Sequence, residues 1–129
     1  MENQKKIMIV EDDELMLKIL EFILKKENYK ISIAKDGLNA IERIPIILPD
    51  LIISNIMLPY KSGYEILSFV KQNYNTIATI ILSALKDEES AVLKAFNLGA
   101  DDFIGKPFNP QELLLRIRRL INKKSTLET

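Results

Sequence analysis

Residues 49–59, PDLIISNIMLP, decide the fold. The centre of this stretch, residues 51–54, is apolar without alternation, which is typical of a central parallel strand covered on both faces. A polar side chain, Asn55, follows directly. Ligands of open parallel sheets bind beyond the carboxyl ends of the strands. The stretch therefore predicts a buried strand and a functional position at Asn55.

Similar short runs, rich in Ile and Val, recur along the chain and alternate with longer segments of helical spacing. This alternation predicts an α/β protein in which crossover helices join parallel strands. We expect strands at residues 7–10, 30–34, 51–54, 79–83 and 102–105.

Helices are expected between these strands. The first is predicted from the apolar stripe of Leu15, Ile19, Phe22 and Ile23. Residues that commonly cap helix N-termini precede three of the others: Asp36, Ser62 and Asn109. In the remaining helix, the fourth, Asp87, Glu88 and Glu89 place acids in the first turn, where the helix dipole favours them. The pattern is therefore β-α, repeated about five times.

Length and composition bound the possible functions. The 129 residues suffice for one domain with a core, and 18 Lys+Arg balance 18 Asp+Glu, so no excess basic charge points to nucleic acid. Because Cys and His are both absent, disulfide scaffolds, zinc ribbons, thiol nucleophiles and Ser-His-Asp triads are excluded. The N-terminal residues form no secretory signal, and no apolar run could span a membrane, so we expect a cytoplasmic protein.

Side chains of complementary chemistry stand at the carboxyl ends of the predicted strands: Glu11, Asp12, Asn55, Ser83 and Lys106. Paired carboxylates suit Mg²⁺, while a hydroxyl and an ammonium suit phosphoryl oxygens. Each residue alone also has a simpler interpretation: a solvated helix start for the acids, a strand-end cap for the serine, a surface lysine. Together they predict a phosphoryl site that lacks a carboxylate nucleophile at position 55.

Over residues 5–122 the chain resembles the receiver domain of bacterial two-component response regulators. The matching segments are IMIVEDDE, PDLIISNIMLPYKSGYE, TIILSA, GADDFIGKPF and NPQELLLRIRRL, in the family's order. The resemblance implies a three-layer (βα)5, flavodoxin-like doubly wound fold with the five-stranded parallel sheet in order 2-1-3-4-5. Residues 123–129 are then expected to be a C-terminal tail or the start of a linker.

The resemblance also implies roles for individual residues. Asn55 matches an aspartate that a sensor histidine kinase or phosphotransfer protein phosphorylates. Glu11 and Asp12, with Asn55 and the Met57 carbonyl, match the Mg²⁺ ligands. The remaining matches are Ser83 and Lys106 as phosphoryl contacts, Phe103 as the aromatic switch, and Pro107 after a cis bond.

Asparagine at position 55 separates family membership from family activity. The amide nearly matches aspartate in volume, so the fold should survive, but it is no usable nucleophile, so phosphotransfer should be blocked. We therefore expect no enzymatic activity. We also expect weak Mg²⁺ binding, because one negative charge is missing from the site. Ser54 is not expected to replace the acceptor, since strand side chains alternate. Two origins stay open: a natural pseudo-receiver that signals by binding alone, or an aspartate replaced by design.

Four residues predict a surface for partners: Asp101, Asp102, Glu112 and Arg116. They resemble the ion pairs through which many receivers form homodimers across the fourth helix, fifth strand and fifth helix. The alternative is a solvated amphipathic helix, whose exposed ion pairs contribute little. No membrane contact and no direct nucleic-acid binding are expected.

Three other classes of function remain for comparison. A phosphatase-like hydrolase would need a nucleophile or an activated water. A flavodoxin-like cofactor binder would need a phosphate-cradling loop after the first strand, where this chain is acidic. A purely structural interaction module would show no effect of Mg²⁺.

Overall fold

The structure is a computed structural model that describes residues 4–128, with side chains to residue 123. Strands and helices alternate throughout, as the sequence predicts. The order is β1 (Lys6–Val10), α1 (Glu14–Lys26), β2 (Lys30–Ala34), α2 (Gly37–Ile47), β3 (Leu51–Ser54), α3 (Gly63–Asn73), β4 (Ala78–Ser83), the 3-10 helix η1 (Ala84–Asp87), α4 (Glu89–Asn97), β5 (Asp102–Gly105) and α5 (Pro110–Glu128).

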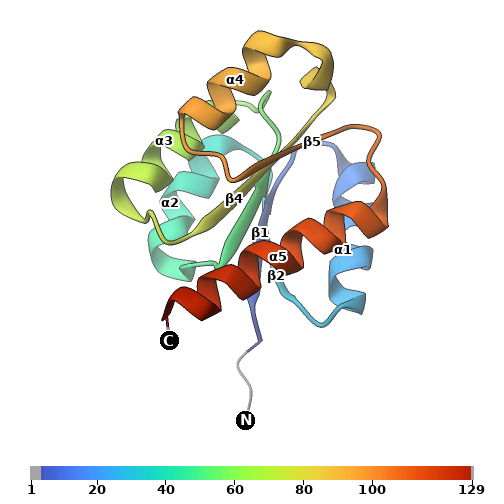
Figure 1. Ribbon diagram of the computed structural model, residues 1–129. Helices are drawn as coiled ribbons and strands as arrows, with labels where there is room; N and C mark the ends of the chain where they lie inside the picture. The colour runs from blue at the N-terminus through green and yellow to red at the C-terminus, as the bar shows by residue number, and fades with distance from the viewer. Residues whose placement is uncertain (1–3, 129) are drawn as a thin grey trace.

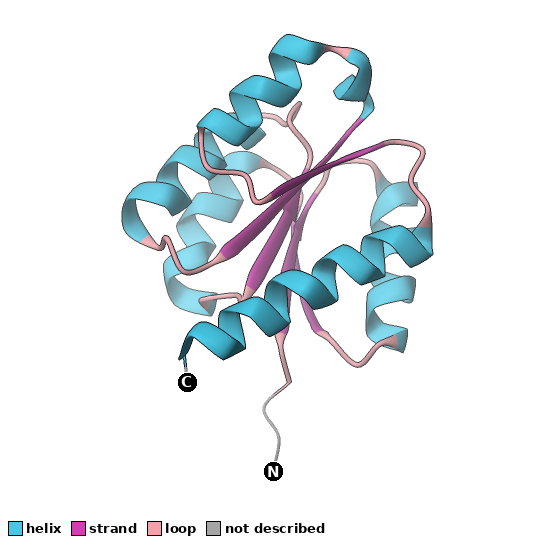
Figure 2. Ribbon diagram, in the orientation of Figure 1, coloured by secondary structure: helices cyan, strands magenta, loops and turns pink. Residues whose placement is uncertain are grey.

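All strands pair in parallel in one sheet of order β2-β1-β3-β4-β5. Helices α1 and α5 cover one face of the sheet, and α2, α3 and α4 cover the other (Figures 1 and 2). The predicted three-layer, doubly wound fold and its strand order are confirmed. Three of the five predicted strands have the expected bounds, and β1 and β4 each begin one residue earlier.

The central strands are buried on both faces, which explains their unbroken apolar runs. Alternate residues of β1 serve different layers: Ile7 and Ile9 pack towards α1 and α5, while Met8 and Val10 pack towards α2 and α3. The core therefore holds the carboxyl ends of the strands in fixed register, and these ends carry the candidate site.

Helix α1 forms where the sequence predicts, but of the apolar stripe that signalled it only Ile23 packs against the core. Leu15 and Phe22 are 67% and 69% exposed, and Ile19 is also exposed. The buried side consists of Leu17, Leu20 and Leu24, another stripe of helical spacing. The helix is apolar over much of its circumference, so spacing alone could not choose between the two sides.

The fourth helix also differs from expectation in its start. Of the three acids expected in the first turn, only Glu89 lies there: Asp87 ends η1, and Glu88 is the N-cap residue of α4 and makes no side-chain capping bond. Helix α5 continues to Glu128, into the segment expected to be a tail or linker, and Thr129 lies outside the described residues. Within residues 4–128, no helix is long and apolar enough to cross a membrane.

Candidate functional site

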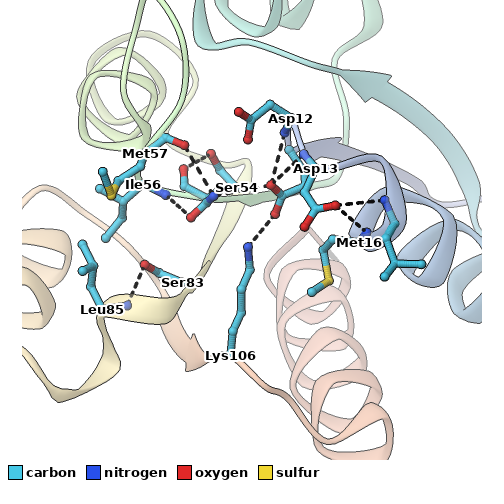
Figure 3. A network of polar contacts seen from close by, with 12 residues as sticks. Asp12, Asp13, Met16, Ser54, Ile56, Met57, Ser83, Leu85 and Lys106 are labelled. Carbon is cyan, nitrogen blue, oxygen red and sulfur yellow. Dashed lines mark hydrogen bonds and ion pairs between the residues drawn. The ribbon is translucent and has the colours of Figure 1, made fainter.

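The site lies at the carboxyl edge of the sheet, where four strands deliver polar side chains. Glu11 follows β1, Asn55 follows β3, Ser83 ends β4, and Lys106 follows β5. The N–H of Asn55 donates to the carbonyl of Val10 at 3.1 Å, which ties the ends of β1 and β3 together. Figure 3 shows Ser83 and Lys106 at this edge, together with Asp12 and Met57.

The strongest contact joins residues far apart in the chain. Lys106 Nζ donates to Glu11 Oε1 at 2.7 Å, and the two side chains are only 17% and 3% exposed. The second carboxylate oxygen, Oε2, accepts the backbone N–H groups of Asp12 and Asp13, each at 3.2 Å. A buried charge needs such partners. Lys106 is therefore part of the site and not a free surface lysine.

The Asn55 side chain makes hydrogen bonds with three polar groups in the loops around it. Its Oδ1 accepts the N–H of Ile56 at 2.9 Å. Its Nδ2 donates to Glu11 Oε2 and to the Met57 carbonyl, each at 3.4 Å (Figure 3). The Met57 side chain itself is exposed, so only the backbone of this residue takes part.

The oxygen atoms expected to bind Mg²⁺ are thus only partly available to a cation. Mg²⁺ requires oxygen ligands. Asn55, however, turns hydrogen atoms and not its oxygen towards Glu11 and Met57. Among the described residues, no group of three or more Asp, Glu, His or Cys could hold a metal ion. As arranged, the residue set does not fit Mg²⁺ without rotation of the Asn55 amide.

The acids after β1 divide into two kinds. Asp12 is exposed at the site, whereas Asp13 caps α1 and accepts the N–H groups of Leu15 and Met16. Glu14, in the first turn, pairs with Lys35 at 2.7 Å, and the hydrogen bond from Lys35 lowers the pKa of the Glu14 carboxyl. The helix-start interpretation therefore holds for Asp13 and Glu14, and the site interpretation concerns Glu11 and Asp12.

Ser83 is 1% exposed, and its Oγ accepts the N–H of Leu85 at 3.1 Å. It therefore caps η1 here, as its simpler interpretation predicts. Phe103 is partly buried and packs against the cluster that contains Ile56 and Ile81, and the Lys106–Pro107 bond is cis, as the resemblance implies. Ser54 is buried, and its Oγ donates to the carbonyl of Asn55 at 2.8 Å.

The predicted partner surface is assembled in part. Arg116 donates through Nη1 to both carboxylate oxygens of Asp102, at 2.8 and 2.7 Å, and through Nη2 to Glu112 at 3.4 Å. The hydrogen bond that Arg116 donates to the Asp102 carboxylate raises the pKa of the Arg116 guanidinium. Asp101 instead accepts the backbone N–H of Thr79 at 2.8 Å, although it lines the same shallow hollow between β5 and α5.

Two glycines that the sequence analysis did not single out shape the loop 55–62 beside the site. A Cβ on Gly63 would stand 2.2 Å from the Asn55 carbonyl oxygen, and one on Gly37 would stand 1.7 Å from the Lys61 carbonyl oxygen. Both glycines begin helices directly after their cap residues. That position was the available signal, because glycine there permits another backbone to approach closely.

The sheet order and the polar carboxyl edge define a flavodoxin-type α/β protein of the CheY-like class. A family model described as the response regulator receiver domain matches residues 7–118. The chain belongs to the receiver domain family of response regulators.

Solved structures agree. The Francisella response regulator 1452 receiver domain is 30% identical with a TM-score of 0.86, covering 93% of this chain and 98% of that one. A CheY-like receiver domain protein from Methanospirillum hungatei JF-1 is 29% identical with a TM-score of 0.88, covering 96% and 98%. The BeF3-activated DrrB receiver domain is 34% identical with a TM-score of 0.85, covering 93% and 99%.

Proposed function

We propose that this receiver domain carries Asn55 at the position where other receivers carry the phosphoacceptor aspartate, so that phosphotransfer is blocked. The observation that carries the proposal is the grouping of Asn55 with Glu11 and Lys106 at the carboxyl edge of the sheet. An acyl phosphate forms only when a carboxylate oxygen attacks phosphorus. The Asn55 amide offers no such oxygen, so the domain would have no autophosphorylating or phosphatase activity.

The other residues keep proposed roles around that position. Ser83 and Lys106 would contact the oxygens of a phosphoryl group, while Glu11, Asp12 and the Met57 carbonyl would bind Mg²⁺ only after the Asn55 amide has turned away from Glu11 and Met57. Phe103 would be the aromatic switch, and Pro107 would fix the backbone after Lys106. The short Glu11–Lys106 contact supports this assignment, because it brings the lysine to the same carboxylate that Asn55 touches.

The partners proposed for the domain are a sensor histidine kinase or a phosphotransfer protein, in the cytoplasm, with no membrane or nucleic-acid contact by this domain. A homodimer across α4, β5 and α5 is part of the proposal. Arg116 with Asp102 and Glu112 supplies its charges, and Leu93 and Leu115 supply exposed apolar area. Sedimentation equilibrium of Leu115→Glu beside the parent would test the dimer.

A second candidate is a pseudo-receiver, an interaction module that acts independently of phosphorylation. The pairing of Lys106 with Glu11 favours it, because the ammonium already has an anionic partner without any phosphoryl group. In this alternative the domain binds its target constitutively, and position 55 contributes only to packing.

Intact mass spectrometry tests the primary proposal. The protein and its Asn55→Asp variant are incubated with Mg²⁺ and acetyl phosphate, and an Asn55→Asp, Lys106→Ala variant serves as the control. We expect a phosphoryl mass on Asn55→Asp alone, with a marked decrease in the control. A phosphoryl mass on the parent would contradict the proposal. Its absence from all three proteins would favour the pseudo-receiver.

A further inference from the structure

The orientation of the Asn55 amide follows from the chemistry of its neighbours. The N–H of Ile56 can only donate, so the atom 2.9 Å from it must be Oδ1. Glu11 Oε2 and the Met57 carbonyl oxygen can only accept, so the atom 3.4 Å from both must be Nδ2. The reverse orientation would oppose like groups at all three contacts, so the hydrogen-bond network allows one assignment.

Nδ2 therefore lies between two oxygens of the kind that Mg²⁺ binds, a carboxylate and a backbone carbonyl. The other carboxylate oxygen of Glu11 already has the Lys106 ammonium 2.7 Å away. Protein N–H groups thus supply the positive partners for Glu11 and for the Met57 carbonyl. Asp12, the exposed acid of the pair, leaves its carboxylate towards solvent.

We propose that the Asn55 amide takes the place of the divalent cation, so that this pocket is assembled and stable without Mg²⁺. The inference rests on the proposed function, since it concerns the same position. It adds that asparagine at position 55 removes two things: the carboxylate nucleophile and the pocket's need for the metal. The domain would hold one metal-independent state instead of responding to the cation.

Replacement of Asn55 by aspartate tests the inference. In Asn55→Asp an oxygen replaces Nδ2, about 3.4 Å from Glu11 Oε2 and the Met57 carbonyl oxygen. Two carboxylates and a carbonyl would then converge with only Lys106 to balance them, and like charges at this separation repel strongly when partly buried. A cation would relieve that repulsion. The variant should therefore depend on Mg²⁺ although the parent does not.

Thermal unfolding followed by circular dichroism measures this dependence. The parent, Asn55→Asp, and Asn55→Asp with Asp12→Asn are each melted in EDTA and in MgCl2. The Tm of the parent should change by less than about 1 °C, whereas that of Asn55→Asp should rise by about 4 °C at Mg²⁺ well above its dissociation constant. The double variant should lose most of this rise, because its exposed carboxylate is gone.

A second readout uses the parent alone and so does not depend on any variant folding. In ¹⁵N-labelled protein, the side-chain NH2 signal of Asn55 should stay in place during a MgCl2 titration. A shift of that signal, or a parent Tm that rises as much as that of Asn55→Asp, would overturn the inference. So would the absence of any Mg²⁺ response in both proteins. None of these results alters the acetyl phosphate experiment, whose failure would instead reject the proposed receiver chemistry.

Discussion

Two lysine–carboxylate contacts in this protein have the same length and very different surroundings. Lys106–Glu11 and Lys35–Glu14 both measure 2.7 Å. The first pair is 17% and 3% exposed at the side chains, and the second is 62% and 64% exposed. Exposed pairs are screened by water and contribute little, whereas removal of one partner from a buried pair leaves an uncompensated charge. Burial, and not distance, should therefore decide their contributions to stability.

Lys106→Met should lower the free energy of unfolding by about 3 kcal/mol, because Glu11 would stay buried without its cation. Urea unfolding followed by circular dichroism at neutral pH measures the loss. The matched control is Lys35→Met, which breaks a contact of equal length at the surface and should have a much smaller effect. Equal losses in the two variants would contradict this account of the site.

The sequence identified which residues meet at the site but not how they bond. Strand periodicity predicts that Glu11, Asn55 and Lys106 lie at one edge, because parallel strands end on the same side. The direction of the Asn55 amide depends on Ile56 N–H and on Glu11, and the second contact crosses 44 residues. A cap was the simpler interpretation of Ser83 and is confirmed, but the 3-10 helix η1 that Ser83 caps was not predicted from spacing.

At the scale of elements, helix α3 shows how local sequence holds the site. Ser62 Oγ accepts the N–H of Glu65 at 3.3 Å, and the Glu65 carboxylate accepts the N–H of Ser62 at 3.1 Å. This capping box was predicted from the sequence and is confirmed. The first residue of the helix, Gly63, donates its N–H to the Ile56 carbonyl at 2.8 Å, so the cap also positions the loop after Asn55.

The capping box predicts a dependence of stability on pH. The hydrogen bond from the Ser62 backbone lowers the pKa of the Glu65 carboxyl below its usual range. A carboxyl with a lowered pKa in the folded state binds protons more readily when unfolded. Its stabilising contribution is therefore present above the unfolded pKa and is lost as pH falls through the lowered folded pKa.

Denaturant unfolding of the parent and of Glu65→Gln between pH 7 and about pH 3 measures this contribution. The difference in unfolding free energy between them should favour the parent at neutral pH and shrink as the solution becomes more acidic. Ser62→Ala should lower the free energy of unfolding by about 1 kcal/mol, as expected for loss of an N-cap side chain. A parent and Glu65→Gln with the same pH profile would show that the carboxylate does not contribute.

Helix α1 marks the limit of prediction at this scale. Its existence followed from the spacing of apolar residues, but Leu15 and Phe22 lie on the exposed side while Leu20 and Leu24 are buried. Which side faces inward is decided by packing against β1 and α5, and those partners are distant in sequence. Order and type of element were therefore predictable from the sequence, whereas the packed face of a broadly apolar helix was not.

At the scale of the whole molecule, three layers bring distant segments to one edge. The parallel sheet aligns the ends of β1, β3, β4 and β5, and helices on both faces bury the strands behind them (Figure 1). The order 2-1-3-4-5 was predicted through the family resemblance and is confirmed. Because the fold supplies the rest of the receiver pocket, a single side chain at position 55 is proposed to decide whether that pocket accepts a phosphoryl group.

The most direct test of that claim is the binding of beryllofluoride, measured by ¹⁹F NMR. BeF3⁻ bonds to a carboxylate oxygen in the geometry of a phosphoryl group, and it is observed at equilibrium, so hydrolysis of an aspartyl phosphate cannot hide a competent pocket. In the presence of Mg²⁺, Asn55→Asp should show a bound fluoride signal that is lost with Lys106→Ala, and the parent should show none. A bound signal in the parent, or none in Asn55→Asp, would contradict the claim that position 55 alone separates this pocket from an active receiver.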